Sequence, residues 1–245
     1  MNLDEIATED VPDTENLPKV ITNSIANNPE DFYKMAFEFQ QIMMVYESAI
    51  KQIETKLDIL NKENKVSGRR STIETVKSRI KSPQSIAGKL QKRNLPMTFE
   101  AMVGNLDDIA GVRVICPYIS DIYTVRDLLL KQPDISLVQE KDYIKTPKPS
   151  GYRSLHLVIE IPVYLSEATH NVHVEIQIRT IAMDFWASLE HQLRYKKNFA
   201  VTDDMLRELK ECAEMSAQLD CRMEALRKVL RSSLDQYDIK GNLLE

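Results

Sequence analysis

The sequence contains no long apolar run, few cysteines and no secretion-type N-terminus. No stretch of its 245 residues approaches the roughly 20 apolar residues needed to cross a membrane, and the first ten, MNLDEIATED, are acidic. Only three cysteines are present, and they lack the spacing of metal ligands or of a CxxC pair, which predicts buried, reduced thiols. We therefore expect a cytoplasmic protein that does not bind to membranes.

Several well-known catalytic and nucleotide-binding motifs are also missing. The sequence has no GxGxxG, GxxxxGKS/T, GxSxG or HExxH, so Rossmann, P-loop and hydrolase-elbow chemistries lose support. A net charge of -5 argues against a protein that coats nucleic acid through an overall positive charge. Positive charge is instead concentrated locally, as expected of a site for a polyphosphate.

Two segments, 154–161 and 172–179, alternate between apolar and polar residues. Because successive side chains of a strand point to opposite faces, the pattern predicts two strands that could pair as neighbours, each with a core face and a polar face. The alternative is a sheet whose polar face is simply solvated. The polar positions are Ser154, His156 and Glu160 in the first segment and His173, Glu175, Gln177 and Arg179 in the second.

The segment KDYIKTPKPSGYRSLH, residues 141–156, is a basic loop that leads into the first strand. Its PSGY turn includes Gly151, which allows the backbone to approach a ligand closely. The loop and the polar strand face together provide carboxylate, imidazole and cationic groups, a combination that suits a magnesium-phosphate substrate. The cations of the loop are Lys141, Lys145, Lys148 and Arg153.

A second basic segment covers residues 71–95. Ser82 can cap a short helix from Pro83 to about Arg93. Residues two apart in an extended chain point the same way, as do residues three apart on a helix, so the cations could converge on one anion. The alternative is a solvated basic face. The candidate cations are Arg79, Lys81, Lys89, Lys92 and Arg93.

Two acids, Asp107 and Asp108, precede an apolar strand predicted over 112–116. An aspartate at the mouth of a strand is a suitable magnesium ligand, because the strand holds the carboxylate rigidly near the edge of the sheet. The same position is equally typical of a helix cap. Both interpretations stay open at this point.

Helical periodicity dominates both ends of the chain. An apolar stripe predicts a helix over 28–66, after an acidic arm, 1–27, that we expect to be mobile. From Thr202 a second long helix carries a seam at alternating spacings of four and three, from Met205 to Leu230, and such a seam requires a partner helix. The partner could be the N-terminal helix or the same surface of a second subunit.

Shorter elements lie between these helices. A helix is predicted over 121–131, a strand at ISLVQEK, and a further helix directly after the second alternating strand. The resulting order predicts an α+β fold, a mixed β-sheet flanked by helices with long N- and C-terminal helices. Four apolar residues of the further helix are expected to face inward, namely Ile181, Phe185, Leu189 and Leu193.

The chain resembles the synthetase domain of the RelA/SpoT family, in particular its small alarmone synthetases, over about residues 70–197. The matching segments are RIKSPQSIAGKL, DDIAGVRV, YIKTPKPSGYRSLH and VEIQIRTIAMDFWASLEH, in the family's order. The resemblance implies a nucleotidyltransferase-like mixed sheet that transfers pyrophosphate from ATP to the 3′-hydroxyl of GTP or GDP, which makes pppGpp or ppGpp and AMP with Mg2+ as cofactor. Alternatives are another acceptor, such as an adenine nucleotide or a tRNA, or a non-catalytic RNA-binding protein.

The resemblance also implies roles for individual residues. Asp108 corresponds to the magnesium ligand, and Glu175 to an acid that helps the metal or takes the 3′-hydroxyl proton. Arg153 and Arg179 are expected to be structural ion-pair partners. The residues implied to bind ATP are Arg79, Lys81, Lys89, Lys92 and Arg93. Those implied to bind GTP are Lys141, Lys148, Tyr152, His156 and Gln177, with Tyr152 stacking on guanine.

These expectations divide the chain into the acidic arm (1–27), the N-terminal helix (28–66), a catalytic domain (67–200) and a C-terminal helix suited to oligomerisation (201–245). The resemblance and the apolar seam both favour a homo-oligomer, a homotetramer first and a dimer second. Ser150 stands where long members of the family usually carry Asn, so one acceptor contact is expected to differ. Regulation by an RNA or by an alarmone stays open.

Overall fold

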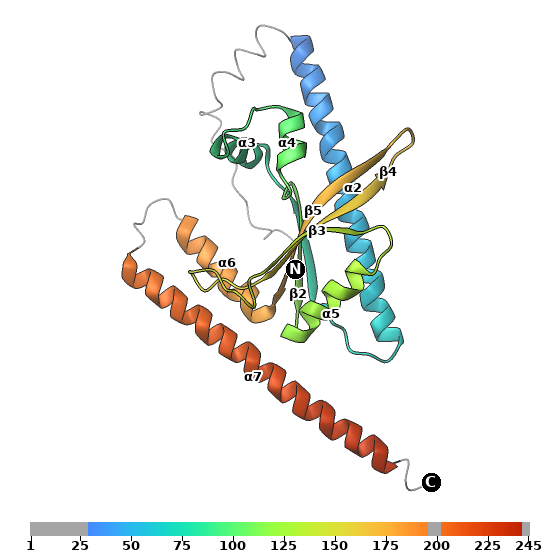
Figure 1. Cartoon of the computed structure of the whole chain (residues 1–245), viewed down its shortest axis with the longest axis vertical. Coiled ribbons are helices and arrows are strands. Elements are labelled where there is room, and N and C mark those ends of the chain that lie inside the picture. The colour runs from blue at the N-terminus through green and yellow to red at the C-terminus, as the bar shows by residue number, and fades with distance from the viewer. Residues whose placement is uncertain (1–28, 196–201, 242–245) are drawn as a thin grey trace, which may run out of the picture. The chain divides into compact units, whose positions relative to one another are not determined.

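The computed structural model describes residues 29–195 and 202–241, so the arm predicted at 1–27 lies outside the described residues. The chain divides into two compact units, of which the first ends at Met43. Among the described residues, that unit holds only the N-terminal part of helix α2 (Pro29–Val66). The second unit begins at Met44 and contains every other element described below (Figure 1).

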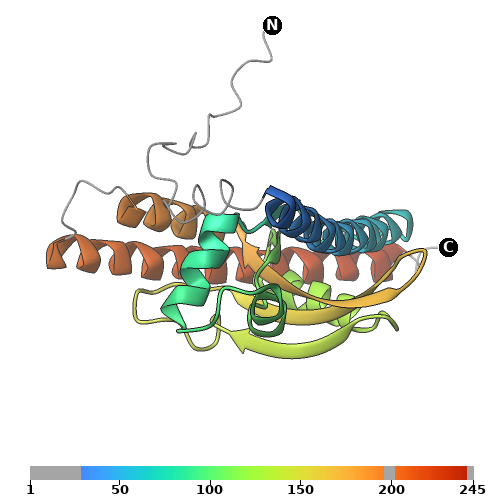
Figure 2. The ribbon, with the colours of Figure 1, turned by 90° about the horizontal axis from the view of Figure 1, so that it is seen from above.

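The centre of the second unit is a five-stranded mixed sheet in the order β1-β2-β5-β4-β3 (Figures 1 and 2). Strands β2 and β5 are parallel, and the other neighbouring pairs are antiparallel. The sheet confirms the predicted mixed α+β fold, and β4 and β5 pair as neighbours, as expected. The strands are β1 (Thr75–Ile80), β2 (Ala110–Cys116), β3 (Ser136–Asp142), β4 (Leu155–Tyr164) and β5 (Thr169–Thr180).

The apolar positions of β4 and β5 lie in the core, as the period of two predicts. Leu157 and Ile176 face each other across the two strands, and both are fully buried. Helix α5 (Ile119–Leu130) adds Ile122 to the buried side chains, and α2 adds Ile53. Burying one such side chain contributes about 1.5–3 kcal/mol. The core therefore fixes which face of β5 is left for polar residues.

Three short elements lie between α2 and β2. Helix α3 (Pro83–Lys92) begins after Ser82, whose hydroxyl accepts a hydrogen bond from the Ser85 N–H, as predicted. Strand β1 and helix α4 (Phe99–Asn105) are absent from the sequence-based prediction. Strand β1 is an edge strand with mostly exposed side chains, so it shows little apolar alternation, and α4 has only seven residues.

Helix α6 (Ile181–Tyr195) forms as predicted but buries a different face. Its buried residues include Trp186 and Ala187, because helix α7 (Asp203–Gly241) packs there and the Trp186 indole N–H donates to the Leu209 carbonyl at 2.7 Å. The four residues expected to face inward are all exposed, so that prediction is wrong. They are Ile181, Phe185, Leu189 and Leu193.

Helix α7 keeps much of its predicted apolar seam at the surface of the single chain. The exposed seam residues include Leu219, Met223, Leu226 and Leu230. The thiols of Cys212 and Cys221 are exposed on the same helix, which corrects the expectation that all the cysteines are buried. Cys116 on β2 is buried as expected.

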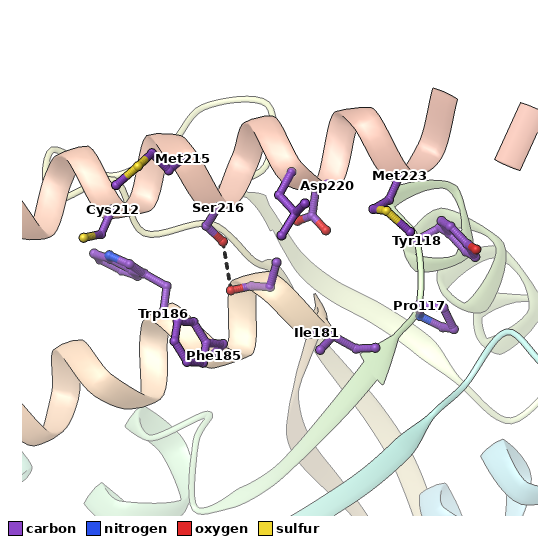
Figure 3. Close-up of a pocket in the computed structure, with 12 residues that line it drawn as sticks. Pro117, Tyr118, Ile181, Phe185, Trp186, Cys212, Met215, Ser216, Asp220 and Met223 are labelled. Carbon is purple, nitrogen blue, oxygen red and sulfur yellow. Dashed lines mark hydrogen bonds between the residues drawn. The ribbon is translucent and has the colours of Figure 1, made fainter. Parts of the chain in front are cut away.

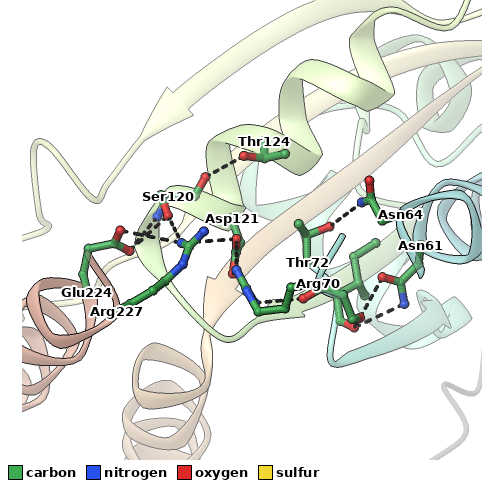
Figure 4. A network of polar contacts seen from close by, with 11 residues as sticks. Asn61, Asn64, Arg70, Thr72, Ser120, Asp121, Thr124, Glu224 and Arg227 are labelled. Carbon is green, nitrogen blue, oxygen red and sulfur yellow. Dashed lines mark hydrogen bonds and ion pairs between the residues drawn. The ribbon is translucent and has the colours of Figure 1, made fainter. Parts of the chain in front are cut away.

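A polar network fastens α7 to α5 and to the connection after α2 (Figure 4). Asp121 of α5 is almost fully buried, and its carboxylate lies 2.6 Å from Arg70 and 3.5 Å from Arg227 of α7. Glu224 of α7 accepts hydrogen bonds from the Ser120 N–H at 3.2 Å and from its hydroxyl at 3.1 Å. A buried carboxylate is tolerated when its charge is paired, so this network anchors α7 on the domain.

The helices of the described ranges, 29–195 and 202–241, include none that is long and apolar enough to cross a membrane. This holds for α2 and α7 as well, the longest helices in those ranges, because charged residues recur throughout both.

Candidate active site

The polar face of β4 and β5 forms the centre of a charged cluster. We call His156, Glu175, Gln177 and Arg179 the polar sheet face. In the sheet register His156 lies opposite Gln177, while Gly111 of the parallel strand β2 lies beside Glu175. His156, Glu175 and Gln177 are half-buried, Arg179 is buried, and they bind one another. This arrangement argues against a face that is simply solvated.

Asp108 lies just before β2 and is held by two lysines. Its carboxylate is 3.0 Å from Lys81 Nζ and 2.7 Å from Lys89 Nζ, so cations from the end of β1 and from α3 converge on it. Burial alone would raise the pKa of Asp108, but its contacts with Lys89 and Lys81 outweigh burial and hold the pKa below its usual value. The next element is strand β2, so the helix-cap interpretation is wrong.

Glu175 is held by His156 and Gln177. Its Oε1 lies 3.3 Å from His156 Nδ1, and its Oε2 accepts a hydrogen bond from Gln177 Nε2 at 2.9 Å. Burial would raise the pKa of Glu175, but these two contacts outweigh it, despite the nearby charge of Asp108, and hold the pKa below its usual value. Two ionised carboxylates therefore lie near each other at this edge of the sheet.

A chain of hydrogen bonds extends from Arg179 to Glu175. Arg179 Nη2 donates to the Tyr152 hydroxyl at 2.7 Å, and that oxygen lies 2.8 Å from His156 Nε2. Because arginine can only donate, the Tyr152 hydroxyl is left to donate to Nε2, and the hydrogen of His156 then sits on Nδ1, facing Glu175. Arg179 also pairs with Asp184 at 3.1 Å, in agreement with the ion-pair role expected for it.

The basic loop folds so that its aromatic and cationic residues contact one another. Lys148 Nζ lies 4.6 Å from the ring centroid of Tyr143 and 4.8 Å from that of Tyr152. The Arg179 guanidinium lies 5.2 Å from the Tyr152 ring. A base that stacks on Tyr152 therefore competes with these cations for the ring. Lys141, on β3 opposite His156, is exposed.

Of the other cations that were predicted to bind ATP, only some lie near Asp108 and Glu175. Arg79 on β1 lies opposite Gly111, which is itself beside Glu175. Lys92 is exposed at the end of α3. Arg93 donates to the Asn105 carbonyl at 2.6 Å and so joins α3 to α4. Arg93 is thus engaged with α4 and not with Asp108.

Arg113 and Asp184 belong to the cluster but are absent from the predicted site. Arg113 Nη1 lies 3.3 Å from the Asp184 oxygen that also binds Arg179. Burial, followed by the charges of Arg179 and Arg79, lowers the pKa of Arg113, although Asp184 acts in the opposite direction. The sequence signal that could have identified Arg113 was an arginine at a polar position of an apolar strand. The sheet register places this arginine opposite Gln177.

The oxygen ligands at this edge fit Mg2+, which usually takes one or two protein carboxylates together with substrate phosphates and waters. The Oδ1 atom of Asp108 is buried without a well-aligned hydrogen-bond donor, since Lys89 approaches it as an ion pair. Asp107 is instead engaged by His173 at 2.9 Å. Within 29–195 and 202–241, no three His, Cys, Asp or Glu side chains gather as a metal cage. The cluster therefore fits a magnesium-nucleotide site, in which the protein supplies only one or two of the metal ligands.

Sequence comparison links the region of the cluster to one family. Residues 78–200 match the family described as "Region found in RelA / SpoT proteins". The chain is 45% identical over 199 residues to the GTP pyrophosphokinase YwaC of Bacillus subtilis. That alignment covers 81% of this chain and 95% of YwaC.

Two solved structures of small alarmone synthetase 1 from Bacillus subtilis are similar in fold. The structure bound to its product pppGpp is 33% identical with a TM-score of 0.72, and the match covers 78% of this chain and 97% of that one. The structure bound to AMPCPP is 29% identical with a TM-score of 0.68, and the match covers 80% and 98%. The similarity extends over most of this chain and almost all of each relative.

Proposed function

Because the chain belongs to the RelA/SpoT family, we propose that it is an alarmone synthetase that transfers pyrophosphate from ATP to the 3′-hydroxyl of GTP or GDP. The observation that carries this proposal is the pair of ionised carboxylates, Asp108 and Glu175, set among lysines and arginines at one edge of the sheet. The relatives support it, since YwaC is a GTP pyrophosphokinase and small alarmone synthetase 1 binds pppGpp and AMPCPP.

In the proposed reaction the 3′-oxygen of the acceptor attacks the β-phosphorus of ATP. The new bond between this oxygen and the β-phosphorus forms while the bond from the β-phosphorus to the α,β-bridging oxygen breaks, so AMP leaves with that oxygen. Glu175 accepts the hydroxyl proton, because it is ionised and its carboxylate is held by His156 and Gln177. The step therefore needs no covalent enzyme intermediate.

On the donor side, the protein supplies positive charge. Lys81 and Lys89 come from separate elements and meet at Asp108, which places them to neutralise the phosphates of ATP, with Arg79, Lys92 and Arg93 in support. Arg113 adds a further guanidinium near Arg79. Mg2+ held by Asp108 and Glu175 would supply further neutralisation and lower the pKa of the attacking hydroxyl.

On the acceptor side, Tyr152 provides the ring for the guanine base. Lys148 already lies over this ring and is placed to move to the acceptor phosphates, together with Lys141. His156 and Gln177 hold Glu175 beside the acceptor. The assignments are supported by the contacts that these side chains make with one another in the folded chain.

The proposal includes a homo-oligomer, with a tetramer expected first and a dimer second. An apolar cavity of about 740 Å³ lies between α6 and α7 and is also lined by Pro117 and Tyr118 (Figure 3). It is continuous along α7 with the exposed seam that ends at Leu230, and single chains rarely leave so many apolar side chains in water. We call these residues the apolar α6–α7 surface. They are Ile181, Phe185, Leu189, Met215, Leu219, Met223, Leu226 and Leu230.

The proposed activity is tested by separating the products on an anion-exchange column after incubation with ATP and Mg2+ and, in separate tubes, GTP, GDP or ADP. AMP together with a more highly charged guanosine product is the expected result. AMP formed only with ADP would instead assign a different acceptor. A protein that makes no AMP in any tube, with or without added alarmone or RNA, would contradict the proposal.

A further inference from the structure

The part of the basic loop around Gly151 and Tyr152, which we call the Tyr152 loop, approaches helix α7 with almost no space between them. Gly151 has a φ of 89°, a conformation that favours glycine. A Cβ at this position would lie 2.5 Å from the Cβ of Ala213 and 3.7 Å from the Lys210 carbonyl oxygen. Glycine is therefore required at position 151 twice, by the turn itself and by the closeness of α7.

Arg153 connects the two elements with hydrogen bonds. Its Nη1 donates to the Gly151 carbonyl at 3.1 Å and to the Ala213 carbonyl at 3.3 Å. A helix carbonyl can accept a second hydrogen bond through its other lone pair, so the Ala213 contact leaves the α7 ladder intact. The guanidinium thus ties the backbone of the turn to the backbone of the helix. This differs from the ion-pair role that the sequence suggested for Arg153.

The tie lies next to the ring that receives the acceptor base. Tyr152 packs against a small buried cluster formed by Trp186, Ala187 and Ala213. Its hydroxyl is fixed at the opposite end by Arg179 and His156. The orientation of the Tyr152 ring is therefore set by α6 and α7 on one side and by the polar sheet face on the other, while Arg153 holds the Gly151 carbonyl directly before it.

We propose that Arg153 is a positioning residue for the acceptor nucleotide, which holds the Tyr152 loop in its binding conformation by bridging it to α7. The inference rests on the proposed function, because it assigns the Tyr152 loop to the acceptor. A loop that is ordered before binding loses less conformational entropy when the ligand arrives, so the bridge strengthens acceptor binding without touching the acceptor. ATP binds at Asp108, Lys81 and Lys89, which Arg153 does not contact in the described structure.

The decisive experiment measures KM for GDP and KM for ATP separately in the full-length protein. Arg153→Met removes the donors and keeps an apolar stem of similar length. Two hydrogen bonds from one charged group are lost, so we expect KM for GDP to rise about tenfold and KM for ATP to stay within about twofold. Arg153→Lys retains one donor group and should restore part of the affinity for GDP.

A matched control separates this bridge from general loosening of α7. Glu224→Gln weakens the contact of α7 with Ser120, about three turns further along the helix than Ala213. It should leave KM for GDP within about twofold of the wild type. From the α7 side, Ala213→Val adds bulk against Gly151 and should raise KM for GDP without a matching rise for ATP.

A second readout does not depend on turnover. Trp186 is the only tryptophan of the chain, and it lies in the cluster against which Tyr152 packs, so its fluorescence reports on this junction. GDP added without ATP should change the emission, and the half-saturation concentration should rise about tenfold in Arg153→Met. If the wild-type protein makes no alarmone, the proposed function is refuted. The fluorescence titration with GDP still decides the role of Arg153, because it does not depend on turnover.

Three results would overturn the inference. Equal changes in KM for GDP and ATP would indicate a general structural effect of Arg153. Unchanged binding of GDP in Arg153→Met would show that the bridge does not order the loop. A change in KM for GDP in Glu224→Gln as large as in Arg153→Met would assign the effect to the docking of α7 as a whole.

Discussion

The polar sheet face and the apolar α6–α7 surface differ in how their side chains are satisfied within one chain. On the sheet face and just before β2, Glu175 and Asp108 each contact cations or hydrogen-bond donors within about 3.3 Å. On the helices, Phe185 is 67% exposed and Leu230 is 66% exposed, with no other part of the described chain covering them. The charged groups are thus paired within one chain, whereas the described chain leaves the apolar surface uncovered.

This difference separates the chemistry of the protein from its assembly. Burying charged groups costs free energy unless each group is paired before the ligand binds. The partners of the charged groups therefore have to come from the same chain. An apolar surface needs only another apolar surface, which a second copy provides in the proposed assembly. Helix α7 contributes to both regions. Its inner side contacts the Tyr152 loop through Ala213, and its outer side carries the apolar seam.

The largest effect is expected at the charged site. Glu175→Gln keeps the size of the side chain but removes the base and one carboxylate of the metal site, so turnover should fall about 1,000-fold while the melting temperature changes little. Alarmone formation and circular dichroism measure the two quantities. Glu160→Gln on β4 is the matched control, since Glu160 is 37% exposed at the side chain and lies opposite His173, and it should retain full activity. Turnover by Glu175→Gln close to the wild type would remove Glu175 from its proposed role.

The next effect concerns the attachment of α7. Asp121→Ala leaves Arg70 and Arg227 without their shared buried partner, so the free energy of unfolding should decrease by about 3 kcal/mol. Urea denaturation measures it. Asp127→Ala removes an exposed aspartate of the same helix that pairs with Arg126, and it should cost less than about 1 kcal/mol. Equal losses in both variants would mean that the buried network contributes no more than a surface pair.

A smaller effect is expected on the apolar side. Leu219→Glu puts a charge into the α6–α7 cavity, so it should raise the dissociation constant of the assembly at least about tenfold without unfolding the subunit. Light scattering at micromolar concentration measures the mass. Lys228→Glu, on the opposite side of α7, should leave the mass unchanged. A wild-type protein that is already monomeric at this concentration would contradict the proposed assembly.

The sequence was sufficient to predict the parts of the fold that follow from local patterns. The alternation in β4 and β5 fixed the polar sheet face, and Ser82 with Pro83 fixed the start of α3. Edge strand β1 was missed because exposed residues alternate weakly. The inward face of α6 was predicted wrongly because two apolar stripes were available on that helix, and only the packing of α7 decides which one is buried.

The site could be predicted residue by residue only where a motif identified it. The convergence of Lys81 and Lys89 on Asp108 required β1, α3 and β2 to be placed together, which no local pattern specifies. Arg113 was overlooked because a single arginine in an apolar strand is ambiguous until its neighbour Gln177 is known. The bridge from Arg153 to Ala213 joins residues 60 apart in the sequence, and its acceptor is a backbone atom that any residue would provide.

The smallest effect tests a buried carboxylate on the inner side of α7. Asp220 is 6% exposed, and Thr180 Oγ1 lies 2.6 Å from its carboxylate. Burial raises the pKa of Asp220, although Thr180 and the charge of Arg153 act in the opposite direction. The folded state therefore binds this proton more tightly than the unfolded state. Stability from Asp220 is present below the unfolded pKa, about 3.9, and is lost as the pH rises through the higher folded pKa.

Asp220→Asn cannot ionise, so its free energy of unfolding relative to the wild type should increase between pH 4 and pH 7, by about 1 kcal/mol or less. Asp142→Asn is the control of opposite sign. Burial would raise the pKa of Asp142, but hydrogen bonds from the Lys145 N–H, the Tyr123 hydroxyl and the Ile144 N–H lower it overall. Stability from Asp142 is thus present at neutral pH and lost on acidification, so its deficit should shrink as the pH falls. If the free energies of unfolding of both variants, relative to the wild type, changed with pH in the same direction, the prediction would be wrong. Burial on the inner side of α7 would then not raise the pKa of Asp220.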